Sequence, residues 1–334
     1  MISIVHKLLL IVAAICTANQ PSGLPLSLAP IAEINVDDGF RIADSRTTIA
    51  LWNRKEIRYS GVPKIAFRLA SSPVSISSGF RDFTLANGTA LMLERTRVLR
   101  SVDWTTWNQV FELPARFDAR VLAVDSQNIW VAGAKHEGRA NLDRLPNVAV
   151  DADGNTLTAS LGVFRSQSFT ELRIPSTTGA VEEVRICDST ILIRTHFQVL
   201  VSTDSGAKWF ELGPAVQSDS KVEPPLPTAL ACSSSKELWI GYSDRSIVKQ
   251  TAEYPARKTF ARIAAGEEGG ITKLYFVNSK LGYGLVDGEL WATLDGGSNW
   301  KPLKIPDLVV DFAGDDNAIE LITRHQLYTL RPCR

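Results

Sequence analysis

Carboxylates are the side chains of this sequence most suited to acid–base chemistry, and several of them occur as adjacent pairs. Hydrolysis of a glycosidic bond needs two carboxylic acids that face each other across the substrate. The adjacent pairs are Asp37-Asp38, Glu182-Glu183, Glu267-Glu268 and Asp315-Asp316. Successive residues of a strand point to opposite faces of a sheet, so we expect these pairs to lie in turns and solvated loops. None is identified as catalytic.

Residues that bind metals are sparse and scattered. The four histidines lie far apart, and the cysteines show no spacing typical of a zinc site. Residues 151–155, DADGN, look like part of a calcium loop but lack the later glutamate of an EF-hand. Their Asp-Gly pair suits the turn of a hairpin. We therefore expect a β-turn there, with no metal and no cofactor.

A charged stretch with few apolar residues occupies residues 132–145, AGAKHEGRANLDRL. It indicates an insertion, and loops held by a rigid scaffold commonly carry binding residues. A solvated loop without a function is the alternative. The candidate binding residues are Lys135, His136, Arg139 and Arg144.

The composition limits the classes of partner. The chain has 334 residues, 45% apolar and 22% charged, with 36 basic and 36 acidic side chains. A balanced charge creates no long-range field that attracts polyanions, so we do not expect a general nucleic-acid binder. The length suits two ordinary domains or one large all-β domain.

The first residues have the character of an export signal. Lys7 precedes the short apolar run LLLIVAAIC, and Thr17-Ala18 provide small residues for cleavage. The run is shorter than the roughly 18 apolar residues of a membrane span. We predict a secretory signal peptide at residues 1–18 and a periplasmic or secreted chain at residues 19–334.

Three cysteines remain after this cleavage. Cys187 and Cys232 each end an apolar run, so we expect two small buried thiols. A disulfide between them is the alternative. The third cysteine is Cys333.

A spaced set of residues recurs along the chain. VSTDSGAKWFELG and ATLDGGSNWKPLKIP share the spacing S/T-x-D-x-G-x-x-W, and RSVDWTTWNQVFELP is a shorter copy without the glycine. The two full copies lie about twice 45 residues apart. The residues concerned are Ser202, Asp204, Gly206 and Trp209; Thr293, Asp295, Gly297 and Trp300; and Ser101, Asp103 and Trp107.

We expect each copy to form a structural turn. The aspartate can accept backbone N–H bonds, and glycine can adopt the backbone conformation of a tight turn. The tryptophan then buries a large apolar surface between adjacent sheets. Trp104 and Trp107 of the short copy are a second binding candidate, with one expected to pack between sheets and the other to be exposed.

The elements that position these turns are short strands. Each repeat holds four β-rich runs separated by turns, and no long stretch has helical periodicity. Four strands in about 45 residues make one blade of a β-propeller. We predict an all-β fold, a single propeller of seven four-stranded blades, with six or eight as alternatives. Residues 308–331 have room for three strands, so we expect residues 25–33, PLSLAPIAE, to supply the fourth and close the ring.

The recurring residues resemble the Asp-box (BNR) repeats of sialidases, sortilin-type receptors and some glycoside hydrolases. With the WVAG-like strand before them and the closing LKIP, they are most similar to the photosystem II assembly and stability factor propellers. The resemblance is strong over residues 180–306. It implies the propeller fold but no photosynthetic role, because that domain also resembles exported bacterial proteins without one.

The likeness to sialidases implies an arginine that binds a substrate carboxylate in an F/Y-R-I-P segment near the first blade. Leu172-Arg173-Ile174-Pro175 imitates this segment but lies in mid-chain. Similar endings occur at residues 111–114 and 303–306, where other blades are expected to end. We interpret the segment as a marker of blade ends.

The sequence thus favours an exported, monomeric, non-catalytic propeller that binds a protein partner as a scaffold or assembly/stability factor in the cell envelope. A carbohydrate-active enzyme or lectin of the Asp-box class is one alternative. An inhibitor or immunity-type protein that binds a secreted effector is another. Acidic and arginine residues gathered at the channel mouth would favour the enzyme, and a broad patch of exposed aromatic and arginine residues would favour protein binding.

Overall fold

The computed structural model describes most of the chain between residues 26 and 332. The described residues are 26–34, 36, 40–45, 48–53, 55–61, 67–70, 80–86, 88–139, 150, 155–175, 179–212, 224–234, 237–251, 257–260, 262–263, 269–314 and 318–332. The expected signal peptide and Cys333 lie outside this set. No helix among the described residues has the length and apolar character of a membrane span.

All described elements are strands, and they form seven four-stranded antiparallel sheets. Blade 1 contains β2 (Arg41–Asp44), β3 (Thr48–Trp52), β4 (Ile57–Gly61) and β5 (Arg68–Leu69). Blade 2 contains β6 (Phe80–Ala86), β7 (Thr89–Glu94), β8 (Arg97–Ser101) and β9 (Asn108–Glu112). Blade 3 contains β10 (Phe117–Val124), β11 (Ile129–Arg139), β12 (Asn155–Arg165) and β13 (Ser168–Leu172).

The next three blades repeat this order of strands. Blade 4 contains β14 (Glu183–Cys187), β15 (Thr190–Arg194), β16 (Val199–Ser202) and β17 (Phe210–Leu212). Blade 5 contains β18 (Pro227–Ser234), β19 (Glu237–Tyr242), β20 (Ile247–Thr251) and β21 (Arg257–Phe260). Blade 6 contains β22 (Ile271–Phe276), β23 (Gly282–Val286), β24 (Glu289–Thr293) and β25 (Lys301–Pro302).

Blade 7 joins the two ends of the described chain. Its inner three strands are β26 (Val309–Gly314), β27 (Ile319–Thr323) and β28 (Gln326–Pro332), and its outer strand is β1 (Leu26–Glu33). β1 pairs antiparallel with β28, from Leu26 opposite Pro332 to Glu33 opposite Gln326. The predicted seven blades and the predicted closing strand are both confirmed.

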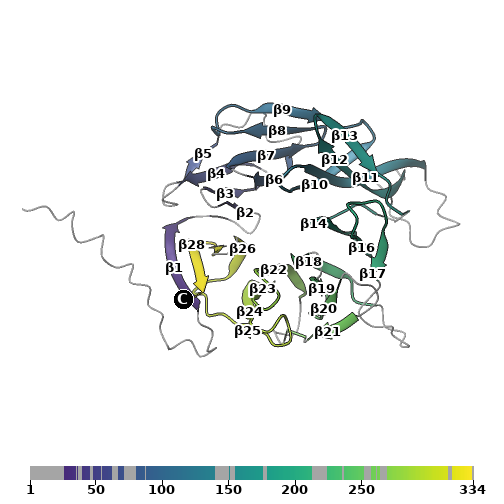
Figure 1. The fold of residues 1–334 in the computed structure, drawn as a ribbon. Coiled ribbons are helices and arrows are strands. Elements are labelled where there is room, and N and C mark those ends of the chain that lie inside the picture. Colours follow the sequence, from purple (N-terminus) through teal and green to yellow (C-terminus); the bar gives the residue numbers. More distant parts are fainter. Residues whose placement is uncertain are drawn as a thin grey trace, which may run out of the picture.

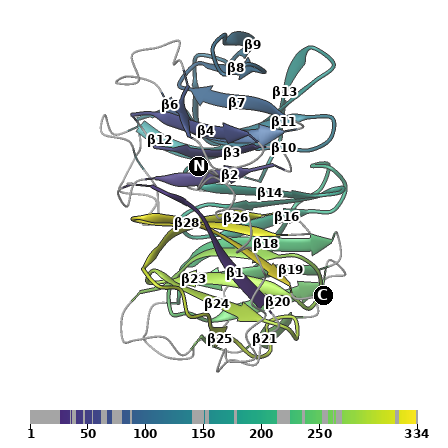
Figure 2. The ribbon, with the colours of Figure 1, turned by 90° about the vertical axis from the view of Figure 1, so that its left-hand side faces the viewer.

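The blades are arranged in a ring with their first strands innermost (Figure 1). Turned by 90°, the same molecule shows β1 running next to β28 in the closing blade (Figure 2). Because each sheet is antiparallel, the turns between second and third strands lie on the same face of the ring as the connections between blades. The turns between third and fourth strands lie on the opposite face.

The core consists of apolar clusters between neighbouring blades. Successive side chains of a strand point to opposite faces, so a middle strand serves two interfaces. In β19, Trp239 packs against blade 6 and Ile240 packs against blade 4. All seven pairs of neighbouring blades have such a cluster, which fixes the ring as one body.

Carboxylates on the inner strands also link one blade to the next. Each accepts a backbone N–H from the inner strand of the following blade. The pairs are Asp82 Oδ2 with Leu122 N (2.8 Å), Glu183 Oε2 with Leu230 N (3.2 Å) and Asp311 Oδ2 with Ile42 N (3.0 Å). Acidic side chains on the inner strands therefore link three of the seven pairs of neighbouring blades.

A disulfide joins blades 4 and 5. It links Cys187 at the end of β14 to Cys232 in β18, with a Cα–Cα distance of 6.4 Å. The expectation of two buried thiols is wrong, and the alternative of a disulfide is correct. The two cysteines occupy the same level of neighbouring inner strands, a relation that appears only when the blades are assembled.

Candidate recognition surface

Three blades pass from their third to their fourth strand through one kind of turn. In blade 4, Ser202 Oγ donates to Asp204 Oδ1 (2.9 Å) and accepts from the backbone N–H of Gly206 (2.8 Å). The φ of Gly206 is 96°, a conformation that favours glycine. Trp209 is half-buried, and its Nε1 donates to the carbonyl of Gly206 at 3.1 Å. Blade 6 has the same contacts in Thr293, Asp295, Gly297 and Trp300.

The short copy in blade 2 uses a tryptophan where the others use glycine. The backbone N–H of Trp104 donates to Ser101 Oγ at 2.9 Å, and its φ is 64°. Its buried ring stacks on Tyr59 at 4.4 Å, between blades 1 and 2. Trp107 is half-buried against the same cluster, so neither tryptophan of this copy is fully exposed.

These turns act within the protein. Hydrogen bonds from the backbone N–H groups of Thr106 and Thr105 hold the pKa of Asp103 far below its ordinary value. The blade 6 turn also reaches blade 5, because Trp239 Nε1 donates to the carbonyl of Gly296 at 3.0 Å. The aspartates thus accept backbone hydrogen bonds from within their own turns.

Arg41, Asp82 and Arg185 lie on the inner strands of blades 1, 2 and 4, and both arginines influence the aspartate electrostatically. Burial raises the pKa of Asp82 to about 6, against the lowering effect of hydrogen bonds from the N–H groups of Leu122 and Phe83 and of the charges of Arg41 and Arg185. Both oxygens of Asp82 accept backbone N–H bonds, so its first role is to link blades 2 and 3.

The structure corrects the predicted loop at residues 132–145 in its first part, and residues 140–145 lie outside the described residues. Residues 132–139 belong to β11, which pairs with β12 from Ile129 opposite Phe164 to Arg139 opposite Asn155. Lys135 forms an ion pair with Glu171, and His136 is half-buried. Arg139 is the last residue of β11. Arg144 and residues 151–154 of the expected calcium-like turn lie outside the described residues.

Blades 3 and 4 are joined by a segment that packs against both of them. The N–H of Val181 donates to Gly133 O (2.8 Å) of β11, and the N–H of Glu182 donates to Arg194 O (2.8 Å) of β15. The long β11–β12 hairpin and the β15–β16 hairpin therefore adjoin the same short segment. Arg173 follows β13, the outermost strand of blade 3, and is exposed.

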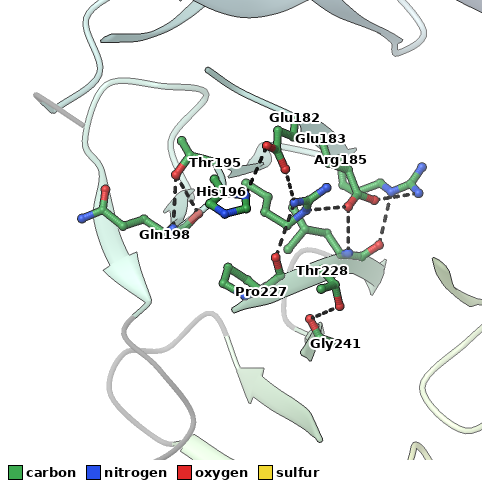
Figure 3. Close-up of polar contacts among 11 residues, drawn as sticks. Glu182, Glu183, Arg185, Thr195, His196, Gln198, Pro227, Thr228 and Gly241 are labelled. Carbon is green, nitrogen blue, oxygen red and sulfur yellow. Dashed lines mark hydrogen bonds and ion pairs between the residues drawn. The ribbon is translucent and has the colours of Figure 1, made fainter. Parts of the chain in front are cut away.

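The pair Glu182-Glu183 lies where the connection from blade 3 enters blade 4, and Arg194 contacts both members. Arg194 Nη1 contacts Glu182 Oε2 at 2.6 Å, and its Nε contacts Glu183 Oε2 at 3.2 Å (Figure 3). The pair was expected in a turn or solvated loop, whereas Glu183 is the first residue of β14 and Glu182 immediately precedes that strand. The other three adjacent pairs lie outside the described residues.

The β15–β16 hairpin ends in an exposed aromatic tip, residues 195–198, which we call the blade 4 tip. Thr195 and Gln198 close it through two hydrogen bonds, Thr195 N to Gln198 O (2.9 Å) and Gln198 N to Thr195 Oγ1 (3.2 Å). Phe197 is 50% exposed, and its ring meets that of His196 edge to face at 4.6 Å. His196 Nδ1 lies 3.7 Å from Glu182 Oε1 (Figure 3).

This tip was not predicted from the sequence. The corresponding turns of blades 1, 2, 5, 6 and 7 carry polar residues or glycine, as in Arg324-His325 of blade 7. A signal was available in the form T-x-x-Q, which the blade 4 tip shares with residues 323–326. The T-x-x-Q motif occurs at the same turn in blades 4 and 7, and of these two turns the one in blade 4 contains a phenylalanine.

No group of three or more His, Cys, Asp or Glu side chains among the described residues is arranged to hold a metal ion. The described surface of blades 3 and 4 instead carries ion pairs, hairpins and the exposed rings of Phe197 and Phe210. Such features suit recognition of another molecule.

No protein-family model and no curated protein matches the sequence. Solved propellers match the fold. Virginiamycin B lyase from Staphylococcus aureus has a TM-score of 0.65 at 10% identity, over 92% of this chain and 99% of its own. YCF48 from Cyanidioschyzon merolae has a TM-score of 0.63 at 11% identity, over 91% and 99%. The WD40 propeller domain of Doa1 has a TM-score of 0.63 at 9% identity, over 90% and 96%. The chain is therefore a seven-bladed β-propeller, and these likenesses show the fold alone.

Proposed function

We propose that this propeller is a non-catalytic protein-binding factor that acts as a scaffold or assembly/stability factor in the cell envelope. The observation that carries the proposal is the exposed Phe197 on a hydrogen-bonded hairpin of a rigid ring. Aromatic side chains held in one conformation are common anchors of protein interfaces. The solved neighbours include YCF48 bound to a D1 peptide, so this fold can bind a peptide.

The proposed compartment has two supports. One is the signal-like composition of residues 1–18. The other is the disulfide between Cys187 and Cys232, because disulfides persist in oxidising compartments and are rare in the cytosol.

The proposed relation to Asp-box propellers has its support in the three turns. Their shared hydrogen bonds from a serine or threonine to an aspartate explain the spacing of the sequence copies. We expect these turns to stabilise the blades and the partner to bind elsewhere on the surface of the propeller.

An affinity purification from a native envelope extract tests the proposal. The chain from residue 19 onward, tagged and bound to a support, is expected to retain a stoichiometric protein partner that untagged chain competes away. Mass spectrometry identifies that partner. Absence of any competed protein, with binding on a glycan array, would contradict protein binding and favour the lectin alternative.

A second candidate function, that of an enzyme, is favoured by one group. Asp82 has a pKa near 6 and is influenced by Arg41 and Arg185, which suits a general acid or base. A glycosidase screen with the wild-type chain and the Asp82→Asn variant tests it. Activity that disappears in the variant would support catalysis, whereas no activity in either protein would count against it.

A further inference from the structure

We infer that the blade 4 tip docks an extended peptide that carries an apolar side chain next to a lysine or arginine. This inference rests on the proposed function and names the surface and the chemistry of the partner. Phe197 is 50% exposed, whereas Thr195, His196 and Gln198 of the tip each make a polar contact.

Both sequence neighbours of Phe197 are tied to carboxylates. His196 Nδ1 faces Glu182 Oε1 at 3.7 Å, and Gln198 Nε2 donates to Glu211 Oε1 at 3.1 Å. Phe197 therefore lies in sequence between two residues that each contact a carboxylate, one at the connection from blade 3 and one on β17. A ligand that covers its ring and reaches both neighbours would meet these carboxylates.

The charges at this tip are arranged with the acids outside. The side chain of Glu182 is 37% exposed, whereas that of Arg194, its partner, is 13% exposed. Glu211 is exposed, and its hydrogen-bond partner, Gln198, is uncharged. Exposed carboxylates beside an exposed apolar ring complement a cationic and apolar segment, which defines the class of peptide.

The chain contains a matched control for this tip. The blade 7 turn, residues 323–326, has the same T-x-x-Q frame, with Gln326 N donating to Thr323 Oγ1 at 3.1 Å. It also places a histidine beside an acid, because His325 Nδ1 lies 3.0 Å from Asp307 Oδ2. It has no apolar ring. Grafting its two central residues onto blade 4 removes the anchor and keeps the turn.

The experiment uses a phage-displayed library of random dodecapeptides selected on the disulfide-bonded chain. Enriched peptides are expected to share an aromatic or aliphatic residue close to a lysine or arginine. The double variant His196→Arg/Phe197→His is expected to bind their synthetic forms at least about tenfold more weakly, the usual effect of losing an aromatic anchor. Glu211→Gln is expected to weaken binding and to reduce its dependence on salt.

Two controls keep the result interpretable. The double variant must unfold at the same urea concentration as the wild type, and Glu211→Gln keeps the hydrogen bond to Gln198 through its amide oxygen. Equal binding by the double variant and the wild type would overturn the docking site while leaving the proposed protein binding intact. Enrichment of no peptide family, or of acidic peptides, would overturn it as well. Failure of the affinity purification alone would count against the proposed function and not against this surface.

Discussion

At the scale of single residues, Trp239 shows how one side chain joins two blades. Its ring is fully buried, stacks on Phe276 at 3.7 Å and lies beneath Lys249 Nζ at 5.0 Å. Its Nε1 also donates to the turn of the next blade. Trp300 of that turn is half-buried and bonds within its own turn. The two tryptophans therefore differ in how much they stabilise the ring.

The first prediction compares these residues by truncation. Trp239→Ala is expected to lower the free energy of unfolding by about 4–5 kcal/mol, the upper range for a buried aromatic. Trp300→Ala and Trp209→Ala are expected to cost roughly 2–3 kcal/mol each, less than the 3–5 kcal/mol of a fully buried ring. Urea denaturation followed by fluorescence measures all three. Equal losses would show that the depth of burial does not set the cost.

The second prediction concerns Asp82 and pH. Its pKa is about 6 in the folded chain and 3.8 ordinarily, so between these values the folded state holds a proton that the unfolded state has lost. Stability is therefore expected to fall as pH rises from about 4 to 6, by roughly 2–3 kcal/mol, and to lose nothing further from this group above pH 6.

The Asp82→Asn variant isolates this effect, because asparagine does not titrate. Urea denaturation at several pH values should show a flatter dependence for the variant between pH 4 and 6. The same slope in both proteins would mean that other groups cause the dependence.

At the scale of elements, the interface between blades 4 and 5 combines polar and covalent links. Arg194 Nη1 reaches Pro227 O at 3.4 Å, and Arg185 Nε donates to Leu230 O at 3.2 Å (Figure 3). The Cys187–Cys232 disulfide follows at the other end of the same two strands. Blades 4 and 5 are thus linked at several points between the two ends of their inner strands.

The third prediction is the cost of removing that disulfide. It spans 45 residues of sequence, and closing a loop of this size in the unfolded chain is worth about 2–4 kcal/mol. The double variant Cys187→Ser/Cys232→Ser should lose this amount in urea denaturation. Dithiothreitol should lower the stability of the wild type by the same amount and leave the double variant unchanged. An effect of the reductant on the double variant would point to a different target.

The elements that could be predicted are those whose residues repeat. The strands and the turns of blades 2, 4 and 6 follow from the spacing of Ser101, Ser202 and Thr293, because each blade needs the same turn at the same place. The length of β11 could not be predicted, because its charged residues suggested a loop. In the structure Lys135 lies in the strand and forms an ion pair with Glu171. The blade 4 tip was missed because exposure depends on which turn faces solvent, and the local sequence THFQ carries no such information.

At the scale of the whole molecule, the ring is closed by a single strand from the other end of the chain. β1 makes its main-chain contacts with β28, while Leu28 packs into the cluster between blades 6 and 7 and Ile31 into the cluster between blades 7 and 1. The stability of these two interfaces therefore depends on a segment that is distant in sequence.

The fourth prediction removes this strand. A chain that begins at Ile34 is expected to lose about 2–5 kcal/mol, from the partial exposure of two apolar clusters, and to associate through the free edge of β28. Thermal unfolding and light scattering measure both effects. A synthetic peptide of residues 26–33 should restore the melting temperature, and a scrambled peptide of the same composition should not. Full stability of the shortened chain would show that the three remaining strands suffice.

The pairing of β1 with β28 sets the order in which the ring can be closed. During synthesis β1 emerges before the other described strands, whereas its partner β28 follows all of them. A polypeptide interrupted at any point before β28 retains an unmatched N-terminal strand and an open ring. The ring can therefore close only after β28 has been synthesised, and β1 has no partner strand until then.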